Sequence, residues 1–175
     1  MEKDAARREE WNRSSDIIIS ILQNKHEYSD SLNNHFQNAR KPGTNLSLSS
    51  AGYEGLKNVG FDIITSDELR NNVVELFEVT QKGLLEEMAY FESFQPERQK
   101  YIDQKFMYDE KTFTLDDPFS VPIIPHEFKA LKDDLYFLSM VKSVLVQRNI
   151  IGSFLMNNLG ESRKVLELIK DELED

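Results

Sequence analysis

The chain has 175 residues, of which 39% are hydrophobic and 30% are charged, and its formal net charge is −10. The hydrophobic content is sufficient for a buried core, whereas the acidic balance disfavours binding to nucleic acid or to an anionic lipid surface. The absence of cysteine excludes disulfides, thiolate metal sites and cysteine nucleophiles. No apolar run approaches the roughly 18 residues that a membrane span needs.

Helical spacing of apolar residues predicts a first long helix over residues 2–39, which stops at 41–45, where Pro42 and Gly43 follow Lys41. A short helix is predicted over residues 50–59, with Ser49 or Ser50 as its N-cap. Gly60 suits the left-handed position just past the end of this helix. Leu56 and Phe61 are spaced for the hydrophobic contact of a Schellman motif.

A second long helix is predicted over residues 66–106. Thr65 and Glu68 have capping-box spacing, which makes Thr65 the expected N-cap. Pro96 should kink this helix or divide it, because proline removes a hydrogen-bond donor and clashes with the preceding turn.

Residues 108–125 are predicted to form an irregular segment that lies along the bundle surface, with a short strand at 112–115. Asp116 and Asp117 are expected to cap a helix or turn, since their spacing is not that of a calcium-binding loop. A short helix is expected over 125–132 and a last long helix over 133–174. The near-heptad stripe of this last helix comprises Leu138, Val141, Leu145, Gly152, Leu155, Leu159, Leu166 and Ile169.

These elements predict an all-α fold, an elongated antiparallel bundle of three long helices with short connecting helices, in a single domain over residues 1–175. The alternative is an extended helix pair that completes a bundle only by dimerising. The near-heptad spacing favours shallow crossing angles between the long helices.

No arrangement of residues typical of catalysis is present. Phosphate-binding glycine loops and the Gly-x-Ser-x-Gly turn are absent. None of the histidines His26, His35 and His126 has a glutamate three residues before it, as a helical di-iron site requires. We therefore expect a protein without catalytic residues, cofactor or metal, and not an enzyme.

Arg148 stands out because it occupies a stripe position where an apolar residue is expected. Two alternatives are open for it. The side chain extends to solvent at the bundle edge, or it is buried in an ion pair or an anion contact that fixes the register of the helices.

The segment Tyr53–Ile64 reads Tyr-Glu-Gly-Leu-Lys-Asn-Val-Gly-Phe-Asp-Ile-Ile, and Ser-Asp-Glu-Leu-Arg follows at 66–70. Together with Trp11-Asn12-Arg13 and the stretch Pro125–Asp134, it resembles a family of uncharacterised single-pass membrane proteins of Bacteroidetes with a helical extracytoplasmic domain. In this motif Lys57–Gly60 end a helix, Phe61 and Ile64 fix the turn to the bundle, and Thr65 caps the next helix. The motif comprises Tyr53, Leu56, Lys57, Gly60, Phe61, Ile64, Thr65, Leu69 and Arg70.

The resemblance implies a location on the periplasmic side of the bacterial inner membrane, with membrane attachment through a helix that is missing from this chain. The chain as given is expected to be soluble. We expect it to act through contacts with a protein partner or as a homodimer, with no nucleic acid bound. The alternative is a small-ligand sensor with a pocket between helices near residues 108–125.

Overall fold

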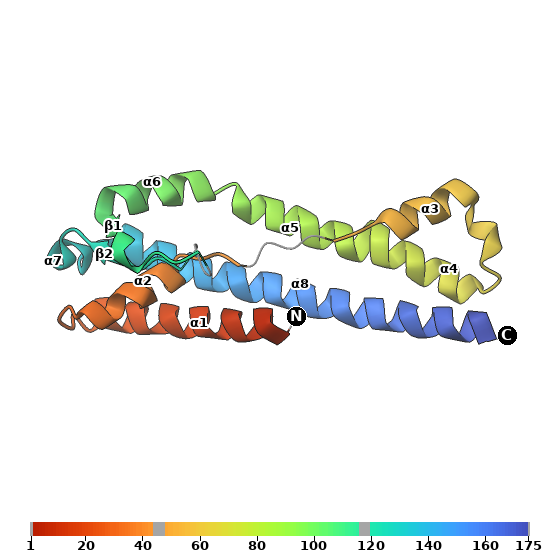
Figure 1. Cartoon of the computed structure of the whole chain (residues 1–175), viewed down its shortest axis with the longest axis horizontal. Helices are drawn as coiled ribbons and strands as arrows, with labels where there is room; N and C mark the ends of the chain where they lie inside the picture. The colour runs from red at the N-terminus through yellow and green to blue at the C-terminus, as the bar shows by residue number, and fades with distance from the viewer. Residues whose placement is uncertain (1, 44–47, 116–119, 175) are drawn as a thin grey trace. The chain divides into compact units, whose positions relative to one another are not determined.

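The computed structural model describes residues 2–43, 48–115 and 120–174, and these are mostly helical with one small sheet (Figure 1). The chain divides into two compact units. Unit 1 comprises residues 1–44 and 91–149, and unit 2 comprises residues 45–90 and 150–175. The mostly helical class is confirmed, whereas a bundle of three uninterrupted long helices is not confirmed. The single-domain organisation stays a prediction.

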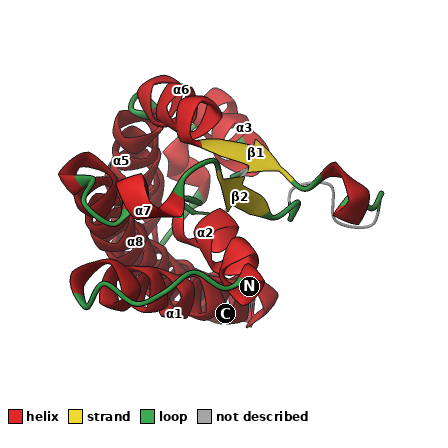
Figure 2. Cartoon of the chain, turned by 90° about the vertical axis from the view of Figure 1, so that its left-hand side faces the viewer, coloured by secondary structure: helices red, strands yellow, loops and turns green. Residues whose placement is uncertain are grey.

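Unit 1 is formed by two separate segments of the chain. Its helices are α1 (Glu2–Gln23), η1 (Asp30–Leu32), α2 (Asn33–Ala39), α6 (Gln95–Lys105), η4 (Glu110–Thr112), α7 (Phe128–Leu131) and the first part of α8 (Leu135–Glu174). Two strands, β1 (Phe106–Tyr108) and β2 (Ile123–Pro125), pair antiparallel with Met107 opposite Ile124. Figure 2 shows these strands beside α6 and α2.

The predicted helix over residues 2–39 is wrong, because it is interrupted after Gln23. Lys25 adopts a positive φ of 53°, and the Oγ of Ser29 accepts a hydrogen bond from the amide of Ser31 to cap η1. The chain therefore reverses between α1 and α2, and these two helices pack against each other. In one continuous helix over residues 2–39, the apolar residues of α1 and of α2 could not pack against each other as they do here.

The core of unit 1 is rich in aromatic rings. The ring centroids of Phe36 and Phe106 lie 5.4 Å apart, and those of Phe106 and Phe137 lie 5.3 Å apart, within the range of favourable aromatic pairs. Its other fully or almost fully buried members are Ile18, Leu22, Leu32, Ala39, Ile102, Ile123, Leu131, Met140 and Val141.

In the segment 108–125, the described residues 108–115 and 120–125 contain a 3-10 turn and parts of two short strands, and the predicted strand at 112–115 is wrong. Residues 110–112 form a 3-10 turn, and Phe113 and Leu115 are exposed, so they have no buried face against which a strand would pack. The strands lie at the two ends of the segment instead, where Phe106 and Ile123 are buried. Asp116 and Asp117 lie outside the described residues.

Unit 2 comprises α3 (Ala51–Val59), η2 (Phe61–Ile63), α4 (Asp67–Val74), the π-helix η3 (Glu75–Gln81), most of α5 (Lys82–Glu92) and the C-terminal part of α8. The predicted break near Pro96 is confirmed: α5 ends at Glu92, and Pro96 lies in the first turn of α6, where its missing N–H costs no helix bond. The predicted short helices before Gly60 and before α8 are confirmed, and so is the last long helix.

The core of unit 2 is smaller than that of unit 1. Six buried residues form it, namely Tyr53, Ile64, Leu69, Val73, Leu76 and Val165, and Leu56, Phe61, Phe77 and Leu168 pack against them half-buried. Gly60 has the predicted positive φ, at 103°, but its ψ of 146° lies outside the left-handed helical region, so the predicted left-handed helical conformation is wrong. Its amide bonds to the carbonyl of Leu56 as in an ordinary helical turn.

Candidate functional site

The start of α4 is the best-defined polar site of unit 2. Ser66, with extended backbone, is the N-cap: its Oγ accepts a hydrogen bond of 3.1 Å from the amide of Leu69. The predicted cap at Thr65 is therefore wrong by one residue. The physical reason is that Thr65 is already engaged by another element.

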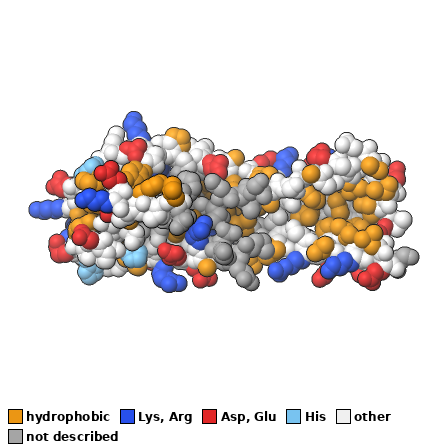
Figure 3. All heavy atoms as spheres, in the orientation of Figure 1, with side chains coloured by type: hydrophobic (Ala, Val, Ile, Leu, Met, Phe, Trp, Pro, Cys, Tyr) orange, Lys and Arg blue, Asp and Glu red, His pale blue; other side chains and the backbone are white. Residues whose placement is uncertain are grey.

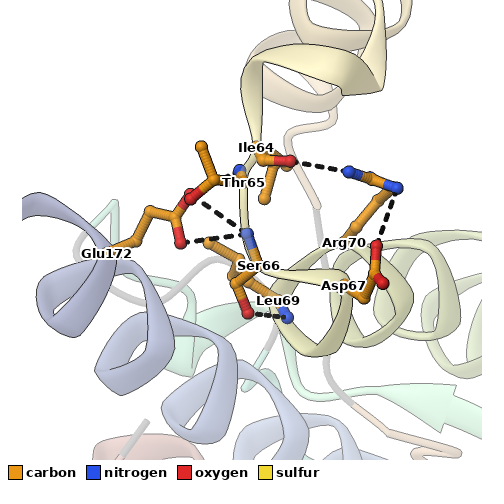
Figure 4. A network of polar contacts seen from close by, with 7 residues as sticks. All are labelled: Ile64, Thr65, Ser66, Asp67, Leu69, Arg70 and Glu172. Carbon is orange, nitrogen blue, oxygen red and sulfur yellow. Dashed lines mark hydrogen bonds and ion pairs between the residues drawn. The ribbon is translucent and has the colours of Figure 1, made fainter.

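Thr65 donates two hydrogen bonds to Glu172 of α8 (Figure 4). Its amide lies 2.6 Å and its hydroxyl 2.7 Å from Oε1 of Glu172, and the amide of Ser66 lies 3.2 Å from Oε2. These hydrogen bonds lower the pKa of Glu172, with the bond from the Thr65 hydroxyl contributing most. A carboxylate at this place also complements the positive end of the α4 dipole.

Arg70 also stabilises the turn that precedes α4. Its Nη2 donates to the carbonyl of Ile64 at 2.8 Å, and its Nη1 pairs with Asp67 at 3.0 Å (Figure 4). Ile64 is almost fully buried and Phe61 packs against the same core. Both side chains therefore pack the turn against the core of unit 2.

A polar cluster surrounds Tyr53 on α3. The ring of Tyr53 stacks on Phe77 with centroids 4.5 Å apart, and its hydroxyl donates to Oε1 of Glu78 at 2.8 Å. Lys57 lies 4.9 Å above the Tyr53 ring and pairs with Glu54 at 2.9 Å. The hydrogen bond from Tyr53 is the main cause that lowers the pKa of Glu78.

An open pocket of about 430 Å³ lies beside this cluster. Its lining comes from α3, η3 and α5 and includes Tyr53, Lys57, Glu78 and Lys82. None of its lining residues belongs to the segment 108–125, near which the sequence predicted a ligand pocket.

Arg148 is fully buried in unit 1, so the alternative in which its side chain extends to solvent is wrong. Its Nη2 donates to Oγ of Ser15 on α1, and to the carbonyl of Ala39 on α2 at 3.2 Å. Its Nε and Nη1 have no hydrogen-bond partner within the described part of the chain.

The alternative of a buried ion pair is not found either: among the side chains that the structure describes, no carboxylate lies within ion-pair distance of the guanidinium. Burial lowers the pKa of Arg148 to about 10, and the distant charge of Asp16 opposes this shift only in part. Arg148 thus joins α8 to α1 and α2 through a hydroxyl and a carbonyl.

Unit 2 exposes many large apolar side chains. Hydrophobic atoms gather on the face of Figure 3 at the end of unit 2 that carries α3 and α4. Over unit 2 as a whole, the large apolar side chains with the largest exposed fractions are Val59 (70%), Ile63 (62%), Met156 (62%) and Leu173 (80%). A surface on which exposed apolar side chains gather, as in Figure 3, is typical of contact with other molecules.

The heptad stripe of α8 continues through unit 2, and three of the exposed apolar side chains lie on it. We call this part of the stripe the α8 seam, and it comprises Leu155, Leu159, Ser162, Leu166, Ile169 and Leu173. Leu166, Ile169 and Leu173 are 52%, 38% and 80% exposed. The core of unit 2 receives a different face of α8, through Val165 and Leu168.

Among the described residues, no group of three or more potential ligands is placed to hold a metal ion. The part of the chain that the structure describes also contains no helix with the length and apolarity needed to traverse a bilayer. Comparisons with protein-family models, with characterised proteins and with solved structures found no match to this chain.

Proposed function

We propose that this protein is a non-enzymatic helical domain that acts through contacts with another protein. The observation that carries the proposal is the α8 seam, where three consecutive apolar positions at heptad spacing are exposed. Transfer of apolar surface from water is favourable by about 25 cal/mol per Å², so a row of exposed leucine and isoleucine side chains favours a partner that covers it.

Photo-crosslinking in the source cells tests this proposal. A photo-reactive residue replaces Leu166 in one variant and the exposed Lys142 in a control, where α8 belongs to unit 1. We expect a discrete crosslinked species, seen with an antibody against the domain, for the Leu166 variant alone. Equal crosslinking at both positions, or none at Leu166, would contradict the proposal.

We also propose, from the family resemblance of the Tyr53–Ile64 motif, that the domain is tethered to the periplasmic side of a bacterial inner membrane. An immunoblot of fractionated source cells tests this. A band larger than the 20.4 kDa of this chain in the inner-membrane fraction is the expected result. A band of this size confined to the soluble fraction would overturn the tether.

A second candidate function, small-ligand sensing, is favoured by the pocket beside Tyr53. Its volume of about 430 Å³ is in the range of ligand sites, and Lys57, Lys82 and Glu78 supply polar groups at its wall. A metabolite screen by thermal shift tests this function. Stabilisation that disappears in Lys82→Ala would support it, and the absence of any stabilising compound would count against it.

A further inference from the structure

We propose that the α8 seam binds an amphipathic α-helix of a partner protein, and that acidic side chains flank the apolar stripe of this helix. The inference rests on the proposed function and specifies the chemistry of the partner. It follows from three features of α8: the length of the seam, the burial of the same stripe in unit 1, and the charge of the exposed flank.

The seam has the dimensions of a helix-binding face. From Leu155 to Leu173 it extends about 27 Å along the helix axis, equivalent to roughly five turns. Leu166 follows Val165 directly, so it lies about 100° further around α8 than the face that packs into the core of unit 2. The seam and the core contact are therefore separate faces of one helix.

Unit 1 buries one of the two heptad positions of the stripe completely and the other, at Leu138 and Leu145, only in part. Val141 and Arg148, at stripe positions of α8, are fully buried, and Arg148 bonds to Ser15 of α1. The amide of Asn12 in α1 also donates to the side chain of Asn149 at 2.8 Å. The stripe continues through unit 2 at unchanged spacing, so the occupant that it fits is another helix.

The exposed flank of the seam is basic although the protein is acidic. Arg163 and Lys170 are one heptad apart, lie next to the seam and are exposed. Glu167 and Glu174 are further around the helix from the seam. On the opposite flank, Val165 is buried and Glu172 is bonded to Thr65. A partner helix on the seam therefore lies beside the cations Arg163 and Lys170 along the exposed flank. Aspartate or glutamate is favoured on the side of the partner helix that faces them.

The same charges disfavour a second copy of α8 as the occupant. In an antiparallel pair related by two-fold symmetry, Arg163 and Lys170 of both copies would face each other, and like charges repel. In a parallel pair, each basic flank would face Val165 and Glu172, which already pack within their own unit.

Two designed helical peptides of about 20 residues test the proposal. Both carry leucine at the stripe positions; one carries glutamate at the flanking positions, and its twin carries lysine there. Fluorescence anisotropy of each labelled peptide is measured against the full chain. We expect the glutamate peptide to bind at least about tenfold more tightly than the lysine twin.

Two variants of the chain locate the binding. Leu166→Gln with Leu173→Gln should weaken binding of the glutamate peptide at least about tenfold, whereas Leu135→Gln, an exposed leucine outside the seam, should leave it unchanged. Arg163→Glu with Lys170→Glu should reverse the preference toward the lysine twin. Equal binding of both peptides, or binding that the seam variant leaves unchanged, would overturn the inference.

Failure of the inference is distinguishable from failure of the proposed function. If neither peptide binds but crosslinking at Leu166 still captures a protein, the acidic helix is wrong and the contact function stands. If the captured protein is a second copy of the chain, the partner inference is overturned as well. If both experiments are negative, both proposals fail.

Discussion

The carboxylate of Glu172, two residues from the end of α8, accepts hydrogen bonds from both the amide and the hydroxyl of Thr65, which directly precedes the N-cap of α4. This single side chain joins the last turn of one helix of unit 2 to the first turn of another. Because the hydroxyl of Thr65 is bonded to Glu172, the N-cap of α4 is Ser66 instead of Thr65.

Glu172→Gln should lower the thermal midpoint at neutral pH, because the amide accepts the bonds from Thr65 without a charge. The pKa of Glu172 is lowered in the folded protein, so the stability it contributes is present above its ordinary pKa of 4.5 and disappears as the pH falls through the folded value. Melting curves of both proteins from about pH 7 to about pH 3 check this. A difference in midpoint that stays constant over this range would contradict the role of the carboxylate.

Ser66→Ala should cost about 1 kcal/mol of unfolding free energy, because the amide of Leu69 loses its capping acceptor. Ser49→Ala is the matched control, since Ser49 is exposed and outside any helix, and it should change stability by less than about 0.5 kcal/mol. Urea denaturation followed by circular dichroism measures both. Equal effects of the two substitutions would argue against the cap.

Gly60→Ala and Gly55→Ala should change stability in opposite directions. Gly60 has a φ of 103°, so a side chain there is strained and should cost about 1–2 kcal/mol. Gly55 lies inside α3 with open space where the Cβ of an alanine would lie, so alanine should stabilise the helix by about 0.5–1 kcal/mol. Denaturation midpoints of the two variants provide the comparison, and a stabilising Gly60→Ala would show that the turn has another conformation.

Arg148→Met should leave the unfolding free energy unchanged or raise it by about 1–3 kcal/mol. Methionine keeps much of the aliphatic stem and removes a buried charge that has no carboxylate partner among the described residues. Arg148→Lys is the contrasting variant. It retains the charge on a group that is more strongly hydrated, and it should be destabilising. A loss of more than about 3 kcal/mol in Arg148→Met would mean that the guanidinium has a compensating partner in solution.

Leu76→Ala should destabilise unit 2 by about 2–5 kcal/mol, because Leu76 is 4% exposed and alanine leaves a cavity. Leu173→Ala, at an 80% exposed seam position, should change stability by less than about 0.5 kcal/mol. Chemical denaturation of both variants measures the difference. A large loss in Leu173→Ala would show that the seam is covered within the isolated chain.

Helices with a regular apolar period could be predicted from the sequence. The last helix is predictable because its stripe continues without proline, and the break near Pro96 follows from the chemistry of that residue. The reversal after Gln23 was missed because it contains neither glycine nor proline. The run of polar residues at 23–27, followed by a serine cap at Ser29, was the available signal.

Contacts between distant segments could not be predicted in the same way. The position of Arg148 on the stripe identified it as unusual, but its acceptors on Ser15 and Ala39 depend on how α1 and α2 fold together. Glu172 and Thr65 are 107 residues apart, and no local pattern links them. Sequence analysis therefore did not identify Glu172 as the partner of Thr65.

The π-helix between α4 and α5 keeps the buried residues of both helices on one face, although their spacing changes from seven to eight residues within it. Leu69 and Leu76 are seven residues apart, as are Leu84 and Phe91, but Leu76 and Leu84 are eight apart, and all four are buried. The wider turn of Glu75–Gln81 accommodates the additional residue. The segment thus has the form of a one-residue insertion into a heptad helix, and a chain that lacks the exposed Val79 would have an unbroken seven-residue repeat from Leu69 through Phe91.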